Sequence, residues 1–117
     1  MTEIATHLEV RSPTPGVAVI EIAGEVTRES DAALKDAYER APSGTRAIVL
    51  TFDRLEYMNS SGIGLLVTLL VRAQRNRQRI LAYGLSEHYR QIFALTRLDE
   101  VIQVHDTAEA ALAAAAA

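Results

Sequence analysis

Apolar positions along the chain follow two different periods, which predicts strands separated by helices. Val17 to Gly24 is rich in β-branched residues and sends every second side chain to the same face, as a strand does. A weaker alternation over His7 to Ser12, followed by a turn that contains Pro13, Pro15 and Gly16, predicts an antiparallel partner strand. The chain is therefore expected to begin with a β-hairpin.

The next segment has helical spacing. Between Glu29 and Ala41, apolar residues recur three and four positions apart, namely Ala33, Leu34, Ala37, Tyr38 and Ala41. Thr27 is the predicted cap of this first helix, and Pro-Ser-Gly at 42–44 is a stop signal.

Two strongly apolar segments follow. Arg46 to Phe52 has apolar residues on both faces, as a central strand covered by helices does, and Asp53 is expected to end it. Gly62 to Arg75 is apolar on nearly every side, which indicates a helix packed in the interior. The residues of this helix expected to be buried are Ile63, Leu66, Val67 and Leu70.

In the last third of the chain, strands and helices are again predicted to alternate. A short strand is predicted at 79–84, a helix at 86–96 and a final strand at 101–105. In the predicted helix one face is shared by Tyr89, Ile92, Phe93 and Thr96. Asp106 and Glu109 stand three apart, like a capping box with Asp in place of Ser or Thr, before an alanine-rich tail that is expected to be a frayed terminal helix.

The predicted order is ββαβαβαβα. Strands separated by helices usually lie parallel with right-handed crossovers, so the expected fold is α/β with a mixed, mostly parallel sheet that opens on an antiparallel hairpin. With 117 residues the chain has the size of one domain. We therefore predict a single domain over 1–117, with a core at about 3–112 and an alanine-rich tail at 113–117.

Composition narrows the class of protein. Hydrophobic residues make up 49% and charged residues 23%, as in a folded globular domain, and the net charge of −3 disfavours nucleic acid and anionic membrane surfaces as partners. The N-terminus has no signal-peptide pattern, and the apolar stretch Ile63–Val71 is about half of the ~20 residues that a membrane span needs. A soluble, cytoplasmic protein is expected.

Motifs for cofactors or catalysis are weak. The chain has no cysteine, and His7, His88 and His105 lie far apart in sequence, so no metal site is expected. Gly62-Ile63-Gly64 is only a fragment of a nucleotide-binding motif. No cofactor and no enzymatic activity are predicted.

Ser60 and Ser61 do not fit the sequence motif of a hydrolase nucleophile. The G-x-S-x-G elbow of α/β-hydrolases requires glycine two residues before the nucleophile, whereas Met58 and Asn59 stand there for Ser60 and Ser61. A small serine hydrolase is therefore a remote alternative.

Four arginines lie within eight residues, at Arg72, Arg75, Arg77 and Arg79. They could form a phosphate or nucleic-acid patch, or they could complement the dipole at the end of the second helix. The second interpretation is favoured, because no aromatic residue interleaves them as single-strand binding requires.

Asn59-Ser60-Ser61-Gly62 stands just before the apolar helix. By itself it suggests an N-cap, in which the side-chain oxygen of Asn59 or Ser60 accepts a free backbone N–H. Gly62 and Gly64 would then let the helix backbone approach the sheet closely.

Three segments carry a wider resemblance: VIEIAGEVT, AIVLTFDRLEYMNSSGIGLL and ILAYGLSEHYRQIFALTRLDEVI. Over about residues 3–112 the chain resembles the STAS domain family, and most closely its anti-sigma factor antagonists, which include the stage II sporulation antagonist. The family places a D-S-S-G-[LI] or related serine motif after a strand and short loop, at the start of the second helix, where this chain has N-S-S-G-I.

The resemblance implies a regulated binding protein. It implies that Ser60 is the phosphorylation site, that the partner is an anti-sigma factor with a histidine-kinase-like ATPase fold, and that a PP2C-type phosphatase reverses the modification. The partner-binding residues that it implies are Glu25, Thr27, Met58, Asn59, Ser60, Ser61, Gly62 and Ile63.

The sequence departs from the family pattern at two of these positions. Many switchable members have aspartate where this chain has Asn59, and the early segment often has aspartate where it has Thr27. The alternative within the family is therefore a constitutive scaffold or transporter-associated subunit without a phosphoswitch.

Overall fold

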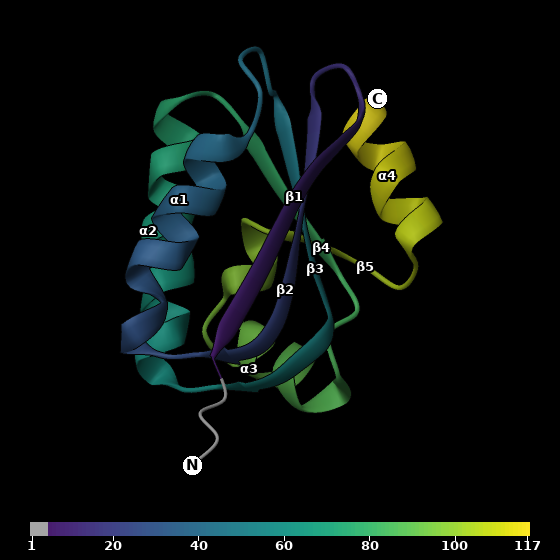
Figure 1. Cartoon of the computed structure of the whole chain (residues 1–117). Coiled ribbons are helices and arrows are strands. Elements are labelled where there is room, and N and C mark those ends of the chain that lie inside the picture. Colours follow the sequence, from purple (N-terminus) through teal and green to yellow (C-terminus); the bar gives the residue numbers. More distant parts are fainter. Residues whose placement is uncertain (1–4) are drawn as a thin grey trace.

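The structure is a computed structural model that describes residues 5–117, so the predicted start of the core at residue 3 lies outside the described residues. In chain order the elements are β1 (Thr6–Thr14), β2 (Val17–Val26), a 3₁₀ turn (Arg28–Ser30), α1 (Asp31–Arg40), β3 (Ala47–Met58), α2 (Ser60–Arg75), β4 (Arg79–Tyr83), α3 (Glu87–Leu95), a second 3₁₀ turn (Leu98–Glu100), β5 (Gln103–His105) and α4 (Ala108–Ala116) (Figure 1). The predicted order ββαβαβαβα is confirmed.

The strands form one sheet in the order β1-β2-β3-β4-β5. β1 and β2 are antiparallel, and each later neighbour pair is parallel, which confirms the mixed sheet with an opening hairpin. β3 lies in the centre, and its first six residues, Ala47 to Phe52, are all buried. The continuous apolar run that predicted a central strand is explained by helices on both sides of it.

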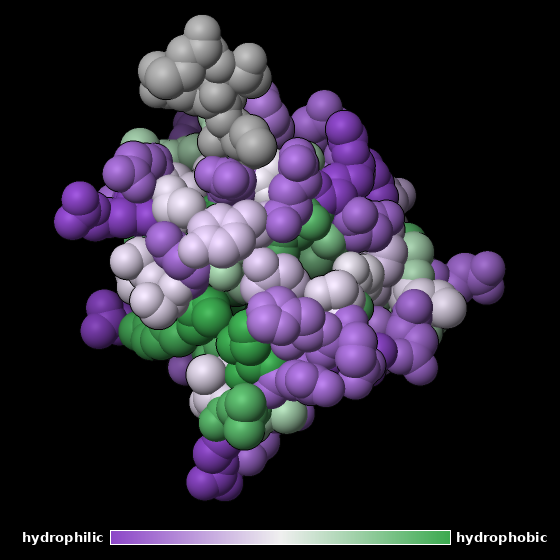
Figure 2. All heavy atoms as spheres, turned by 90° about the horizontal axis from the view of Figure 1, so that it is seen from below, coloured by the Kyte–Doolittle hydropathy of each residue, from purple (hydrophilic) through white to green (hydrophobic). Residues whose placement is uncertain are grey.

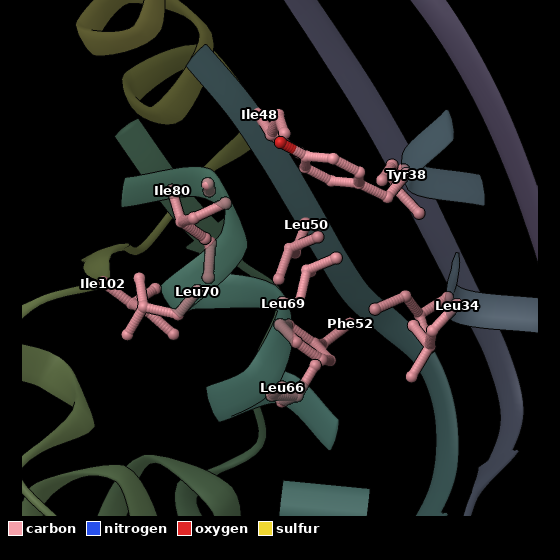
Figure 3. Close-up of a cluster of buried hydrophobic side chains, with 14 of the residues drawn as sticks. Leu34, Tyr38, Ile48, Leu50, Phe52, Leu66, Leu69, Leu70, Ile80 and Ile102 are labelled. Atoms are coloured by element: carbon pink, nitrogen blue, oxygen red, sulfur yellow. The ribbon is translucent and has the colours of Figure 1, made fainter. Parts of the chain in front are cut away.

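Helices cover the two faces of the sheet unequally. α1 and α2 lie on one face and α4 on the other (Figure 1). The larger cluster of buried side chains joins the sheet to the first three helices, and Figure 3 shows its centre between α1, β3 and α2. Phe93 of α3 is fully buried in the same cluster, with its ring 6.1 Å from that of Phe52 in an edge-to-face contact.

β3 is longer than predicted. Asp53 does not end the strand, which continues to Met58. The additional residues remain paired with β2 across two irregularities in register, and Val26 lies opposite Met58. A charged residue after the apolar run suggests a strand end at Asp53, but backbone pairing with β2 continues as far as Met58.

α2 is less enclosed than predicted. Leu66 and Leu70 are buried as expected, but Ile63 is only half-buried and Val67 is 40% exposed. Val71, one turn after Val67, is exposed as well. The helix packs against the sheet and α1 along one side and leaves an apolar stripe on the other, so the prediction of a fully interior helix is wrong.

The last strand and the last cap also differ from prediction. β5 contains only Gln103–His105, because Val101 ends the preceding 3₁₀ turn. The cap of α4 is Thr107, whose hydroxyl accepts a hydrogen bond from the Ala110 N–H at 3.1 Å. The predicted cap, Asp106, instead accepts a hydrogen bond from Arg90, which lowers the pKa of the Asp106 carboxyl.

The alanine-rich tail is docked rather than frayed. α4 continues to Ala116, and Ala111 and Ala115 are buried against Val17, Val19, Ala47, Val49 and Leu81. The Arg79 guanidinium donates hydrogen bonds to the carbonyls of Ala114 at 3.1 Å and Ala115 at 2.9 Å. Small side chains let the helix lie close to this face of the sheet, which sequence alone did not indicate.

Deletion of residues 113–117 should therefore lower the free energy of unfolding by about 2 kcal/mol, although the composition of the tail suggested almost no effect. The deletion removes the buried Ala115 and the carbonyl acceptors of Arg79. Chemical denaturation of the full and shortened chains measures the difference. Removal of 116–117 alone is the control, because it takes away only exposed residues and the long, 3.4 Å hydrogen bond from Arg79 to the Ala117 oxygen. It should cost less than about 0.5 kcal/mol.

Within residues 5–117, no helix combines the length and the apolar character needed to cross a membrane.

Candidate functional site

Two connections that are far apart in sequence meet at one end of the sheet. Glu25 pairs with Tyr57 and Val26 with Met58, so the segment after β2 lies beside the segment after β3. The Asn59 N–H also donates a hydrogen bond to the Val26 carbonyl at 3.3 Å. Glu25, Thr27 and the start of α2 therefore lie at the same end, as a continuous partner surface requires.

Asn59 caps α2. Its side-chain oxygen accepts a hydrogen bond from the Gly62 N–H at 2.9 Å, and its backbone is extended, as in an N-cap. Of the two caps that the sequence left open, the structure has Asn59. The cap leaves Ser60 and Ser61, the first two residues of the helix, with exposed side chains.

Asn59→Ala should lower the free energy of unfolding by about 1 kcal/mol, because the Gly62 N–H loses its acceptor. Asn59→Asp should leave stability nearly unchanged, since a carboxylate accepts the same bond and is favoured at a helix N-terminus. Thermal melts of the two variants test this. Equal melting midpoints for Asn59→Ala and the wild type would show that the cap contributes little.

Met58 and Gly62 lie beneath the site rather than on it. Met58 is 4% exposed, and its N–H donates a hydrogen bond to the Tyr89 hydroxyl oxygen at 2.8 Å. Gly62 is buried, and a Cβ built on it would lie 2.2 Å from the Val26 carbonyl oxygen. These two predicted binding residues therefore position the loop and the helix start and offer a partner almost no surface.

The two glycines of α2 differ. The predicted close approach to the sheet is right for Gly62 and wrong for Gly64, whose Cβ would meet nothing within 4 Å. Gly64 is exposed on the side of the helix that faces away from the sheet.

An open depression lies beside the cap. It is lined by Ala5, Thr6, Glu25, Thr27, Glu29, Ser30, Ala33 and Asn59. The Thr27 hydroxyl donates a hydrogen bond to the Glu29 carboxylate at 3.0 Å, and this bond is the main reason that the pKa of Glu29 is lowered. Glu29 is therefore ionised at neutral pH, and among the residues that line the depression the ionisable side chains are acidic.

Apolar side chains also reach this end of the molecule. Figure 2 shows a group of them, in green, between hydrophilic side chains on the face seen from below. Tyr57 is 47% exposed at the end of β3, and Ile63 is half-buried in the first turn of α2. Exposed apolar and hydroxyl groups next to carboxylates are suited to a protein partner.

The sequence did not single out three residues that shape this region: Glu29, Ser30 and Tyr89. Ser30 is buried, and its hydroxyl accepts a hydrogen bond from the Thr27 N–H at 3.0 Å, which fixes the turn after β2. Thr27 therefore begins a 3₁₀ turn before α1 rather than capping α1 directly. The spacing Thr27-x-x-Ser30 could have indicated this turn, and the acidic Glu29 lies inside it.

Tyr89 carried no local signal in the sequence, because its contact with Met58 joins positions 31 residues apart.

The described residues contain no group of three or more His, Cys, Asp or Glu side chains arranged to hold a metal ion. The arrangement supplies exposed hydroxyls, a helix N-terminus and a carboxylate-lined depression, which are features suited to binding a protein partner. Comparison with known proteins identifies the family.

Residues 10–104 match the family described as "Mlab, STAS domain". The chain belongs to the STAS domain family. This STAS domain is 30% identical over 66 residues to the anti-sigma-B factor antagonist of Staphylococcus aureus (strain NCTC 8325 / PS 47), a match that covers 56% of this chain and 61% of that protein. It is 29% identical over 87 residues to the anti-sigma-B factor antagonist of Listeria monocytogenes serovar 1/2a (strain ATCC BAA-679 / EGD-e), with coverage of 73% and 75%.

Solved structures share the fold of this STAS domain. An anti-sigma factor antagonist from Mycobacterium paratuberculosis has a TM-score of 0.80 at 21% identity, with coverage of 97% of this chain and 96% of that chain. The Bacillus cell fate determinant SpoIIAA in its phosphorylated form has a TM-score of 0.66 at 23% identity (91% and 96%). A sulfate transporter family protein from Wolinella succinogenes has a TM-score of 0.78 at 19% identity (91% and 89%).

Proposed function

We propose that this STAS domain is a cytoplasmic, non-enzymatic anti-sigma factor antagonist. It binds an anti-sigma factor with a histidine-kinase-like ATPase fold through the end of the sheet at Ser60. The observation that carries the proposal is the exposed Ser60 hydroxyl in the first turn of α2, beside the loop that contains Glu25 and Thr27. The similarity to two anti-sigma-B factor antagonists supports it.

The proposed contact surface consists of the exposed and half-exposed members of the predicted set. These are Glu25, Thr27, Asn59, Ser60, Ser61 and Ile63. Met58 and Gly62 hold this surface in place from below. The carboxylates of Glu25 and Glu29 favour a partner with basic side chains opposite the depression.

Phosphorylation of Ser60 by the bound partner is the proposed switch. A phosphoserine carries about −1.5 to −2 charges, and the positive end of the α2 dipole stabilises that charge in the free domain. In the complex the same group adds bulk and a desolvation penalty, so the partner is released while the fold persists. A PP2C-type phosphatase would restore the binding form.

Asn59 makes this switch easier to accommodate within the domain. It satisfies the Gly62 N–H as an aspartate would, but it places no negative charge next to Ser60. The cap does not require a carboxylate at this position, so any such requirement would come from a binding partner that contacts Asn59.

Incubation with the cognate anti-sigma kinase and ATP, followed by mass mapping of the phosphopeptide, tests the switch. Label is expected on Ser60, absent from Ser60→Ala and retained in Ser61→Ala. Label on Ser61 instead would overturn the assignment. Binding without any label would indicate a constitutive antagonist, in which Asn59 has replaced a residue that the kinase needs.

The second candidate is a transporter-associated subunit without a phosphoswitch, which is favoured by the similarity in fold to the Wolinella sulfate transporter family protein. Affinity purification from the native cell distinguishes the candidates, since an ATP-binding kinase-fold protein or a membrane transporter would be recovered. The remote alternative of a serine hydrolase would require turnover of a generic ester that is abolished by Ser60→Ala.

A further inference from the structure

A second hollow lies at the opposite end of the sheet and is lined by arginine. Arg46, Arg77 and Arg79 surround a space of about 220 Å³, together with Ala115 and Ala117 of the α4 end. β3 separates this hollow from the Ser60 end, and its 12 residues extend for roughly 40 Å. The arginine hollow, defined by these three residues, is therefore distinct from the proposed partner site.

The backbone brings the three arginines together from different parts of the chain. Arg46 immediately precedes β3, and Arg79 is the first residue of β4, with its N–H donating to the Arg46 carbonyl at 2.9 Å. Arg77 lies in the connection between α2 and β4, in the left-handed backbone region at φ 57°. A non-glycine residue there is uncommon and indicates a defined turn rather than a continuation of the helix.

Most of the positive charge at this end has no carboxylate side chain beside it in the described part of the chain. Arg46, Arg75 and Arg77 have no Asp or Glu carboxylate within 4.0 Å among residues 5–117. By contrast, Arg54, Arg72 and Arg90 each pair with a carboxylate. Arg79 donates hydrogen bonds to the main-chain oxygens of Ala114, Ala115 and Ala117. Three arginines without a carboxylate partner among the described residues, next to Arg79, form a local basic patch on a chain of net charge −3.

Compensation of the α2 dipole explains only part of this cluster. Arg72 lies over the Tyr38 ring and pairs with Glu39, so it turns away from the hollow. Arg46 belongs to a different element, and Arg77 lies outside the helix. Arg79 is occupied by the α4 carbonyls, whereas Arg46 and Arg77 are exposed and converge on the same space.

We propose that the arginine hollow binds a small ligand that carries several phosphate charges. Guanidinium groups match phosphate oxygens in geometry and remain charged at all physiological pH values. Two exposed, convergent arginines favour a di- or triphosphate group, which carries more than one phosphate charge, over a single phosphate. No aromatic side chain lines the hollow, so the base-stacking surface of a single-strand nucleic-acid site is lacking there.

Calorimetric titration with tripolyphosphate and with inorganic phosphate tests this proposal. The double variant Arg46→Gln/Arg77→Gln should bind tripolyphosphate about 100-fold more weakly than the wild type, at about tenfold for each arginine. Arg79 is left unchanged because it holds α4. The matched control is Arg11→Gln/Arg28→Gln, which removes the same charge from two exposed arginines outside the hollow and should change the affinity less than about threefold.

The source of the phosphate is distinguished by a second arm with lipid vesicles. Co-sedimentation with phosphatidylcholine vesicles that contain a phosphatidylinositol bisphosphate, but not with pure phosphatidylcholine vesicles, would identify a lipid headgroup if it is lost in Arg46→Gln/Arg77→Gln. Binding of tripolyphosphate without vesicle binding would identify a free ligand.

Three results would overturn the proposal. The first is no binding to either probe. The second is an equal loss of affinity in the control variant, which would indicate diffuse attraction. The third is binding of a long RNA by a protein that does not bind tripolyphosphate, which would indicate a nucleic-acid site instead. The melting midpoint of Arg46→Gln/Arg77→Gln without ligand should equal that of the wild type, which separates a binding defect from misfolding.

Discussion

Gly62→Ala is expected to lower the free energy of unfolding by about 3 kcal/mol, because the added methyl group collides with backbone. Its Cβ would lie 2.2 Å from the Val26 carbonyl oxygen and 2.9 Å from the Met58 side chain. The Val26 carbonyl also accepts the Asn59 N–H, so it cannot move away without disturbing the start of α2. Denaturant unfolding measures the loss, and partner affinity should fall as well because the Ser60 surface shifts.

Gly64→Ala is the matched control, two residues along the same helix. Nothing lies within 4 Å of the position of its Cβ, and alanine is the better helix former, so stability should rise by about 1 kcal/mol. Loss of stability in Gly64→Ala, or no loss in Gly62→Ala, would contradict the packing of α2 against the end of β2.

Leu66→Ala should cost about 2 to 5 kcal/mol, because a buried leucine is replaced by a cavity that its neighbours fill only in part. Leu66 is 1% exposed and lies in the cluster between α1, β3 and α2 (Figure 3). Val67→Ala, at the next position, should cost less than about 1 kcal/mol because that side chain is 40% exposed. Equal denaturation midpoints for the two variants would show that the orientation of α2 is wrong.

The order of elements could be read from the sequence because apolar period and turn residues are local signals. The apolar patterns of Val17–Gly24 and Arg46–Phe52 predicted strands that correspond to β2 and to the first half of β3. The stop signal at 42–44 placed the end of α1 close to its observed limit. The wrong predictions concern segments whose structure is determined by contacts with residues distant in sequence. The polar second half of β3 is held by pairing with β2, and the alanine tail is held by the far face of the sheet.

The position of the candidate site could be predicted from the sequence, but which of its residues are buried and which are exposed could not. A strand followed by Asn-Ser-Ser-Gly places the serines at a helix start, and the parallel pairing of β2 and β3 brings Glu25 to the same end. Nothing local shows that Met58 is buried while Ser60 is exposed, since this depends on Tyr89 of α3. The depression at Glu29 likewise depends on the turn that Ser30 stabilises.

Titration of the purified anti-sigma partner against Ser60→Asp and Ser60→Ala tests the proposed function most directly. Ser60→Asp places a negative charge at an exposed helix start, so its melting midpoint should remain close to that of the wild type while the dissociation constant rises about tenfold or more. Ser60→Ala should bind as the wild type does. Equal affinity of the Asp and Ala variants for the partner, with both folded, would contradict a partner interface at Ser60.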